Sequence, residues 1–349
     1  MSNPWRAASH RQRILRTFLP SAILAVVIAG MLALPLYSDA SMTVFGVYNS
    51  FQNLATLGLL ALAVGLTIII GEFDLSTLGM YALGGILAVK FGETAPLLGV
   101  GVAVLAGILF GFFQGAIVAK SGISSVPLTL GGYISLLGLC HIVTDEKTLP
   151  YGNYDVGTWL DADIATIFSP RSLVVIAVFG IVWAAMRWTR LGRDVRALGG
   201  DRRASRAAGV PTDRILIGVF TCSSAFSALG GALFAYSTTA AKPDLGSAPF
   251  IFAVTAVLLG GTSLSGGRGS AAGILMGVLA LSFLETLFAI LATPAYVINL
   301  VRGGLLLLVV IVEAPDLRRR LTVMRARIAN KGTGSGDHLD PAGSGTGTP

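Results

Sequence analysis

Long apolar runs alternate with short polar segments along almost the whole chain. One helical crossing of a bilayer needs roughly 20 predominantly apolar residues, and most of these runs approach that length. The pattern therefore predicts an all-α integral membrane protein with about ten membrane-spanning helices. The expected spans are residues 18–36, 44–70, 75–91, 97–119, 127–143, 172–186, 215–236, 249–259, 271–291 and 296–312.

The composition supports a membrane protein. Of the 349 residues, 54% are hydrophobic and only 12% are charged, too apolar for an ordinary soluble domain. The net charge of +7 would suggest a nucleic-acid partner if the basic residues formed one face of a soluble domain. They stand instead at the ends of apolar runs, so we expect a lipid bilayer and no nucleic acid.

The distribution of basic residues predicts the topology. Arginines recur through residues 187–214 with no lysine among them, and cytoplasmic loops carry such an excess of positive charge. Of the 25 lysines and arginines, only Lys147, Arg171 and Lys242 fall outside, while Lys90 and Arg302 fall within spans. Both termini are therefore expected in the cytoplasm. This divides the chain into a cytoplasmic N-terminal segment (1–17), a transmembrane domain (18–313) and a basic, then Gly/Ser-rich disordered cytoplasmic tail (314–349).

The arginine-rich segment 187–214 also carries helix signals. Asp201 is a good N-cap, the following Ala/Arg run favours a helix, and Gly209 followed by Pro211 is typical of a left-handed cap and a stop. The segment could be a solvated basic loop that only orients the protein. The capping pattern favours a short docking helix at the cytoplasmic surface.

Two glycine-rich breaks interrupt the apolar sequence, Gly71-Glu-Phe-Asp-Leu-Ser76 and Gly260-Gly-Thr-Ser-Leu-Ser265. They share the first Gly and the final Leu-Ser, which hints at an internal repeat of the kind found in transporters. Such breaks let helices pack closely or expose helix ends toward a polar passage. A tight inter-helix turn is an equal alternative.

Polar residues inside apolar runs are costly and therefore informative. At 1.5 Å per residue, Glu285 and Arg302 reach similar heights on the ninth and tenth spans, which predicts an ion pair between them. A structural role for this pair is favoured over one that lines the solute path. The candidates for a polar translocation path, each of which could equally be a helix-packing hydrogen bond, are Gln52, Asn53, Asp74 and Gln114.

No catalytic chemistry is visible in the sequence. A nucleotide-binding Walker A loop needs Gly immediately before Lys, and none of the lysines has one. No catalytic triad and no metal-ligand spacing can be assembled. We therefore expect no catalytic residue, no metal and no cofactor in this chain.

Three motifs carry a family resemblance that runs from about residue 54 to residue 312. They are Gly71-Glu-Phe-Asp-Leu-Ser76, then Leu191-Gly-Arg193 through Gly199-Gly-Asp-Arg-Arg-Ala-Ser-Arg-Ala-Ala-Gly209 to Asp213-Arg214, and Leu259-Gly-Gly-Thr-Ser-Leu-Ser-Gly-Gly-Arg-Gly-Ser270. Together they resemble the permease subunits of ribose-type ABC importers. The resemblance implies a bacterial inner-membrane subunit that pairs with a second permease subunit, identical or different. It also implies separate subunits that bind and hydrolyse ATP, and a periplasmic or extracellular sugar-binding protein.

In that family the arginine-rich segment corresponds to the region that couples to the ATPase, and Gly199, Gly200, Arg206 and Gly209 match its pattern. The chain departs from the family at Glu72 and Phe73, where Gly-Ile is usual. These departures leave the solute open among a monosaccharide, a polyol, a nucleoside and a sugar-like signal. An ion-coupled secondary transporter is the alternative from another class, and dependence of uptake on ATP would distinguish the two.

Overall fold

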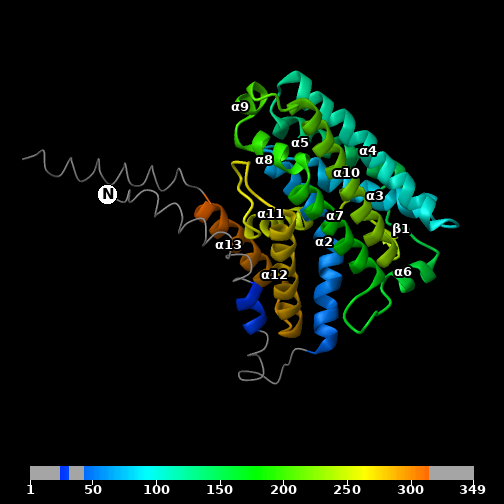
Figure 1. The fold of residues 1–349 in the computed structure, drawn as a ribbon. Coiled ribbons are helices and arrows are strands. Elements are labelled where there is room, and N and C mark those ends of the chain that lie inside the picture. The colour runs from blue at the N-terminus through cyan, green and yellow to red at the C-terminus, as the bar shows by residue number, and fades with distance from the viewer. Residues whose placement is uncertain (1–23, 31–42, 314–349) are drawn as a thin grey trace, which may run out of the picture.

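In a computed structural model, residues 24–30 and 43–313 are described, and most of them are helical (Figure 1). The expectations for segments 1–17 and 314–349, and for most of the first span, lie outside these residues. The helices after residues 24–30 are α2 (Val44–Ile69), α3 (Ser76–Phe91), α4 (Pro96–Ser121), α5 (Ser125–Thr144), α6 (Tyr154–Leu160), α7 (Pro170–Trp188), α8 (Arg190–Gly200), α9 (Arg202–Ala207), α10 (Thr212–Ser237), α11 (Ala248–Leu259), α12 (Ala271–Ile290) and α13 (Ala295–Glu313).

Six of these helices, α2, α4, α5, α7, α10 and α12, are long and apolar enough to cross a membrane by length and composition. Three shorter apolar stretches accompany them, Ser76–Phe91, Ala248–Leu259 and Ala295–Ile311. The protein is thus an all-α, multi-pass membrane protein, as the apolar pattern predicts. The count of ten spans and the cytoplasmic placement of both termini stay predictions.

Local sequence signals explain where several helices begin. The Thr43 side chain accepts a hydrogen bond from the backbone N–H of Gly46 at the start of α2, and Ser270 does the same for Gly273 at the start of α12. At the start of α7, Ser169 and Ser172 bond each other's backbone in a capping box, with Pro170 in the first turn. These side chains satisfy N–H groups that have no partner within the helix.

Helix α2 runs through the middle of the bundle, against α7, α10, α11 and α12 (Figure 1). In its most apolar stretch 78% of the residues are buried, against 22% for α4 and 17% for α5. The two outer helices expose large apolar side chains, among them Phe113 and Ile142. Helices α4 and α5 therefore turn an apolar face to their surroundings, as expected of helices that meet lipid.

Residues 144–170, expected as a polar outer loop, contain ordered structure. Strand β1 (Leu149–Pro150) pairs antiparallel with β2 (Ala240–Ala241), and the short helix α6 follows β1. Helix α6 lies at the opposite end of the bundle from α8 and α9 (Figure 1). Arg171, which the topology assigned to an outer loop, is only 4% exposed, so this side chain is packed inside the protein although the segment before it is polar.

Candidate functional site

The arginine-rich segment folds into two helices, α8 and α9. Asp201 caps α9 as predicted, because its carboxylate accepts hydrogen bonds from the N–H groups of Arg203 (2.8 Å) and Ala204 (2.9 Å). Gly209 ends the helix with a left-handed φ of 82°. The predicted short helix is confirmed. It ends at Ala207, one residue before the end of the Ala/Arg run 202–208.

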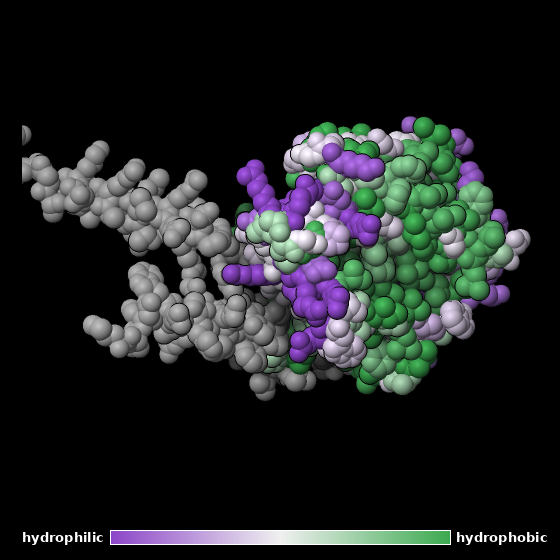
Figure 2. Space-filling model, turned by 45° about the horizontal axis from the view of Figure 1, so that its top comes forward, coloured by the Kyte–Doolittle hydropathy of each residue, from purple (hydrophilic) through white to green (hydrophobic). Residues whose placement is uncertain are grey.

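Helix α8 was not predicted, although its pattern was readable. The side of α8 that faces the bundle carries Gly192, Val195, Leu198 and Gly199, all buried. This spacing of three and four residues marks an amphipathic helix. Its arginines Arg190 and Arg193 are exposed. Figure 2 shows the hydrophilic side chains of this view gathered beside a broad hydrophobic face.

Helices α2 and α11 end in the same way. At the end of α2, the N–H of Gly71 bonds Ile68 O and that of Glu72 bonds Thr67 O; at the end of α11, Gly261 bonds Leu258 O and Thr262 bonds Val257 O. Gly71 and Gly261 both have left-handed φ angles, 81° and 79°, as this C-cap motif requires. The two sequence breaks are therefore similar in structure. The matching residues are Gly71 and Gly261, one position away from the sequence alignment of Gly71 with Gly260.

The end of α8 and the segment after α11 meet the end of α2 in a three-way contact, which we call the glycine junction (residues 69–71, 199–200 and 266–267). The N–H of Gly267 donates to Ile69 O at 2.8 Å. A Cβ atom on Gly199 would lie 1.9 Å from Ile69 O and 2.5 Å from Gly267 N. Backbone therefore meets backbone here with no room for a side chain. The junction joins the three motifs that are far apart in the sequence.

The other residues predicted for coupling are not enclosed in this way. A Cβ atom on Gly200 would meet nothing within 4 Å, and neither would one on Gly209. Arg206 is 59% exposed; its Nε donates to Thr212 Oγ1 at 3.1 Å, and its guanidinium pairs with Asp213. These bonds tie the end of α9 to the start of α10.

A further contact connects α9 to the segment after α2. The guanidinium of Arg202 lies 3.7 Å from the Glu72 carboxylate and donates to Ala119 O at the end of α4 (3.4 Å). Glu72 is one of the residues that depart from the family pattern. In this chain its carboxylate faces an arginine of α9.

The path candidates fall into two groups at opposite ends of α2. Asp74 and Gln114 belong to the first group, where the Ser76 hydroxyl bonds both side chains. Asp74 lies between α2 and α3, and its complete burial raises the pKa of its carboxyl to about 6, because desolvation disfavours the charged form. Among the described residues, Asp74 Oδ2 and Gln114 Nε2 have no hydrogen-bond partner.

Gln52 belongs to the second group, roughly 26 Å away along α2. Its Oε1 accepts from Arg171 at 2.8 Å, and Arg171 also donates to Thr56 Oγ1 (3.1 Å) and lies 2.9 Å from the Asp161 carboxylate. This buried network holds α2, α6 and α7 together. Sequence reasoning missed it, because nothing local to Arg171 indicates burial. Asn53 is half-buried on α2, and no hydrogen bond of its side chain is found in the described residues.

Glu285 of α12 and Arg302 of α13 lie together and form an ion pair. The cavity beside them, lined also by Phe252 and Thr255, measures only about 10 Å³. A single water already needs about 10–15 Å³ of such space. The surroundings of the pair therefore fit a bond between helices rather than a solute path.

These features define a multi-pass membrane protein whose polar helices dock on the ends of central apolar helices. A family model described as "Branched-chain amino acid transport system / permease component" matches residues 46–310. The chain therefore belongs to this family of membrane permeases.

Its curated relatives include the ribose import permease protein RbsC of Escherichia coli strain K12, 30% identical over 78% of this chain and 86% of the relative. The L-arabinose ABC transporter permease protein AraH of Azospirillum brasilense is 29% identical over 81% and 86%. The autoinducer 2 import system permease protein LsrD of Salmonella paratyphi B is 26% identical over 91% and 95%. No solved structure matches the chain.

Proposed function

We propose that this chain is the membrane-spanning permease subunit of an ATP-driven importer for a monosaccharide or a related small carbohydrate. It works in the bacterial cytoplasmic membrane by alternating access. Separate subunits bind and hydrolyse ATP, a second permease subunit completes the pore, and a binding protein on the outer side delivers the solute. This chain itself carries out no covalent chemistry.

The observation that carries the proposal is the glycine junction. An ATPase that moves α8 must also move the end of α2, because Gly199 rests directly on Ile69 O. The end of α2 leads into α3, and the N–H of Gly267 ties the segment between α11 and α12 to the same carbonyl. A displacement at α8 and α9 is thus passed to four helices of the bundle, which suits a rigid-body transition.

The relatives support the solute class. Two of them are named for import, of ribose and of autoinducer 2, and the third is named as an L-arabinose ABC transporter permease. Membership of the same family, at 26–30% identity over most of the chain, favours a small polyhydroxylated solute here as well.

The test is co-purification of the ATPase. The tagged chain is extracted from native membranes in mild detergent as wild type, as Arg206→Glu and as Arg203→Glu. Arg203 is an exposed arginine on the same helix and serves as the matched control for charge reversal. We expect an ATP-binding subunit with wild type and Arg203→Glu, and its loss with Arg206→Glu at equal membrane expression.

Recovery of the ATP-binding subunit with the wild type and with both variants would move the docking surface away from Arg206. Absence of any ATP-binding subunit, in a preparation that keeps other ABC complexes intact, would contradict the importer itself.

A further inference from the structure

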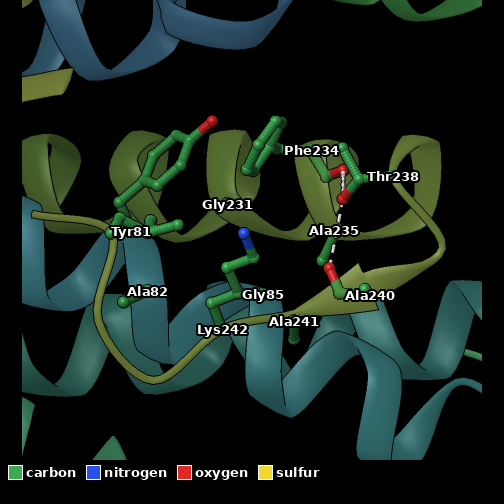
Figure 3. A pocket seen from close by; sticks show the side chains of 11 residues that line it. Tyr81, Ala82, Gly85, Gly231, Phe234, Ala235, Thr238, Ala240, Ala241 and Lys242 are labelled. Carbon is green, nitrogen blue, oxygen red and sulfur yellow. Dashed lines mark hydrogen bonds between the residues drawn. The ribbon is translucent and has the colours of Figure 1, made fainter. Parts of the chain in front are cut away.

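A cavity of about 280 Å³ lies between α3, α10 and the segment 238–245 that follows α10 (Figure 3). None of its lining residues belongs to the glycine junction or to the candidate path residues. Small-molecule sites usually measure roughly 300–1,000 Å³, so this cavity suits a ligand with a single ring rather than a larger one.

Two aromatic rings form one side of the cavity. The rings of Tyr81 on α3 and Phe234 on α10 are 6.0 Å apart, centroid to centroid, and inclined by 36°. The Tyr81 hydroxyl donates to Thr56 O of α2 at 2.6 Å, which fixes the orientation of this ring. An aromatic side beside polar groups accommodates a ligand with an apolar ring face and hydroxyl edges.

The space exists because the neighbouring positions on α3 and α10 carry small residues. A Cβ atom on Gly231 would lie 1.8 Å from Tyr81 O, so the two helices pack backbone to backbone here. Ala82, Gly85 and Ala235 also line the cavity and leave it open. Larger residues at these positions would fill it.

The charge of the cavity comes from one side chain. Lys242 is the only charged residue in the lining, and Figure 3 shows its ammonium nitrogen on the side of Tyr81 and Phe234. No ion pair of Lys242 is found in the part of the chain that the structure describes. An ammonium group donates up to three hydrogen bonds to hydroxyl or carboxylate oxygens, and it repels a cation.

We propose that this cavity binds the solute during translocation, and that it takes one neutral or anionic monosaccharide ring with Lys242 as its hydrogen-bond donor. The site would discriminate against amino sugars that carry a positive charge. This inference rests on the proposed function, because it names the place and the class of the imported solute.

The test uses the complete importer, with its ATPase and binding protein, in proteoliposomes. Uptake of radiolabelled D-ribose, L-arabinose and D-glucose is measured over a range of concentrations, with D-glucosamine as the cationic competitor. The variants are Lys242→Met, which removes the charge, and Lys242→Arg, which keeps it. Lys147→Met is the matched control, because Lys147 is an exposed lysine that lies outside the lining.

Because the Lys242 side chain is exposed, a hydrogen bond from its ammonium group supports an increase of about two- to fivefold in KM when the charge is removed. We expect this increase for Lys242→Met, substantial rescue by Lys242→Arg, and wild-type kinetics for Lys147→Met. D-glucosamine should compete poorly with wild-type uptake. The amount of assembled complex is measured for each variant to separate binding from folding.

If the wild-type importer takes up the sugars and Lys242→Met has the same KM values, the assignment of the cavity is overturned. The proposed function would then still stand. If the wild-type importer, supplied with ATP and its binding protein, takes up none of the three sugars, the inference falls. The proposed function, which also covers other small carbohydrates, is tested separately by co-purification of the ATP-binding subunit. A second variant, Leu245→Trp, narrows the cavity from the loop side. It should reduce uptake of the hexose more than uptake of the pentoses, and equal effects would count against the site.

Discussion

Adjacent glycines at the end of α8 offer a sharp test of the glycine junction. In Gly199→Ala the new Cβ would start 1.9 Å from Ile69 O and 2.5 Å from Gly267 N. Since real Cβ contacts are essentially never under 3.0 Å, α8 must move away from α2 by about an ångström. Both neighbours are backbone atoms, so no side chain can yield instead.

Overpacking of this kind costs about 1–3 kcal/mol. In Gly200→Ala the added Cβ meets nothing within 4 Å, and alanine is the better helix former by up to about 1 kcal/mol. Each variant adds one methyl group to the wild-type protein. We therefore expect opposite signs for their effects on stability.

The assay measures the apparent melting temperature of the purified chain in detergent and, in parallel, ATP hydrolysis by the assembled importer with and without its loaded binding protein. Gly199→Ala should lower the melting temperature and reduce the stimulation of ATP hydrolysis. Gly200→Ala should leave the stimulation unchanged and should not lower the melting temperature. Equal melting temperatures and equal stimulation for the two variants would refute the backbone contact between α8 and α2.

Three further predictions concern named contacts. Arg171→Met should lower the free energy of unfolding by about 3–5 kcal/mol, because it breaks a buried pair with Asp161. In the Arg171→Met background, Asp161→Asn should lower it much less than Asp161→Asn does in the wild type. Denaturant unfolding of the wild type, the two single variants and the double variant measures this coupling. Glu285→Gln and Arg302→Met should each lower the amount of folded protein in the membrane, and the double variant should recover it. If the double variant instead lost as much folded protein as the two single variants together, the ion pair would have no structural role. Asp201→Ala should remove about 1 kcal/mol of capping, seen as roughly fivefold faster amide exchange at the start of α9, and unchanged exchange would contradict the cap.

The sequence could predict what depends on local signals. Apolar runs located α2, α4, α10 and α12, and the Asp201 and Gly209 caps located α9. The Glu285 and Arg302 side chains could be brought together because helix rise alone places them at the same height. Helix α8 could also have been predicted, since Val195 and Leu198 repeat at a helical spacing.

What depends on long-range packing could not be predicted. Gly71, Gly199 and Gly266 are separated by long stretches of sequence, and nothing local to any of them indicates that their backbones meet. The burial of Arg171 depends in the same way on Gln52 and Asp161, which are provided by other helices. For this reason the sequence alone suggests a single translocation path for Gln52, Asn53, Asp74 and Gln114. In the structure, most of the length of α2 separates Gln52 from Asp74.

We propose that this chain serves an importer driven by ATP. The most direct measurement is uptake of radiolabelled D-ribose and L-arabinose into cells that express the complete importer, with ATP and the proton gradient controlled separately. We expect uptake to continue when an uncoupler collapses the gradient at constant ATP, and to stop when ATP is depleted. Uptake that collapses with the gradient while ATP is maintained would contradict ATP-driven import and indicate an ion-coupled carrier.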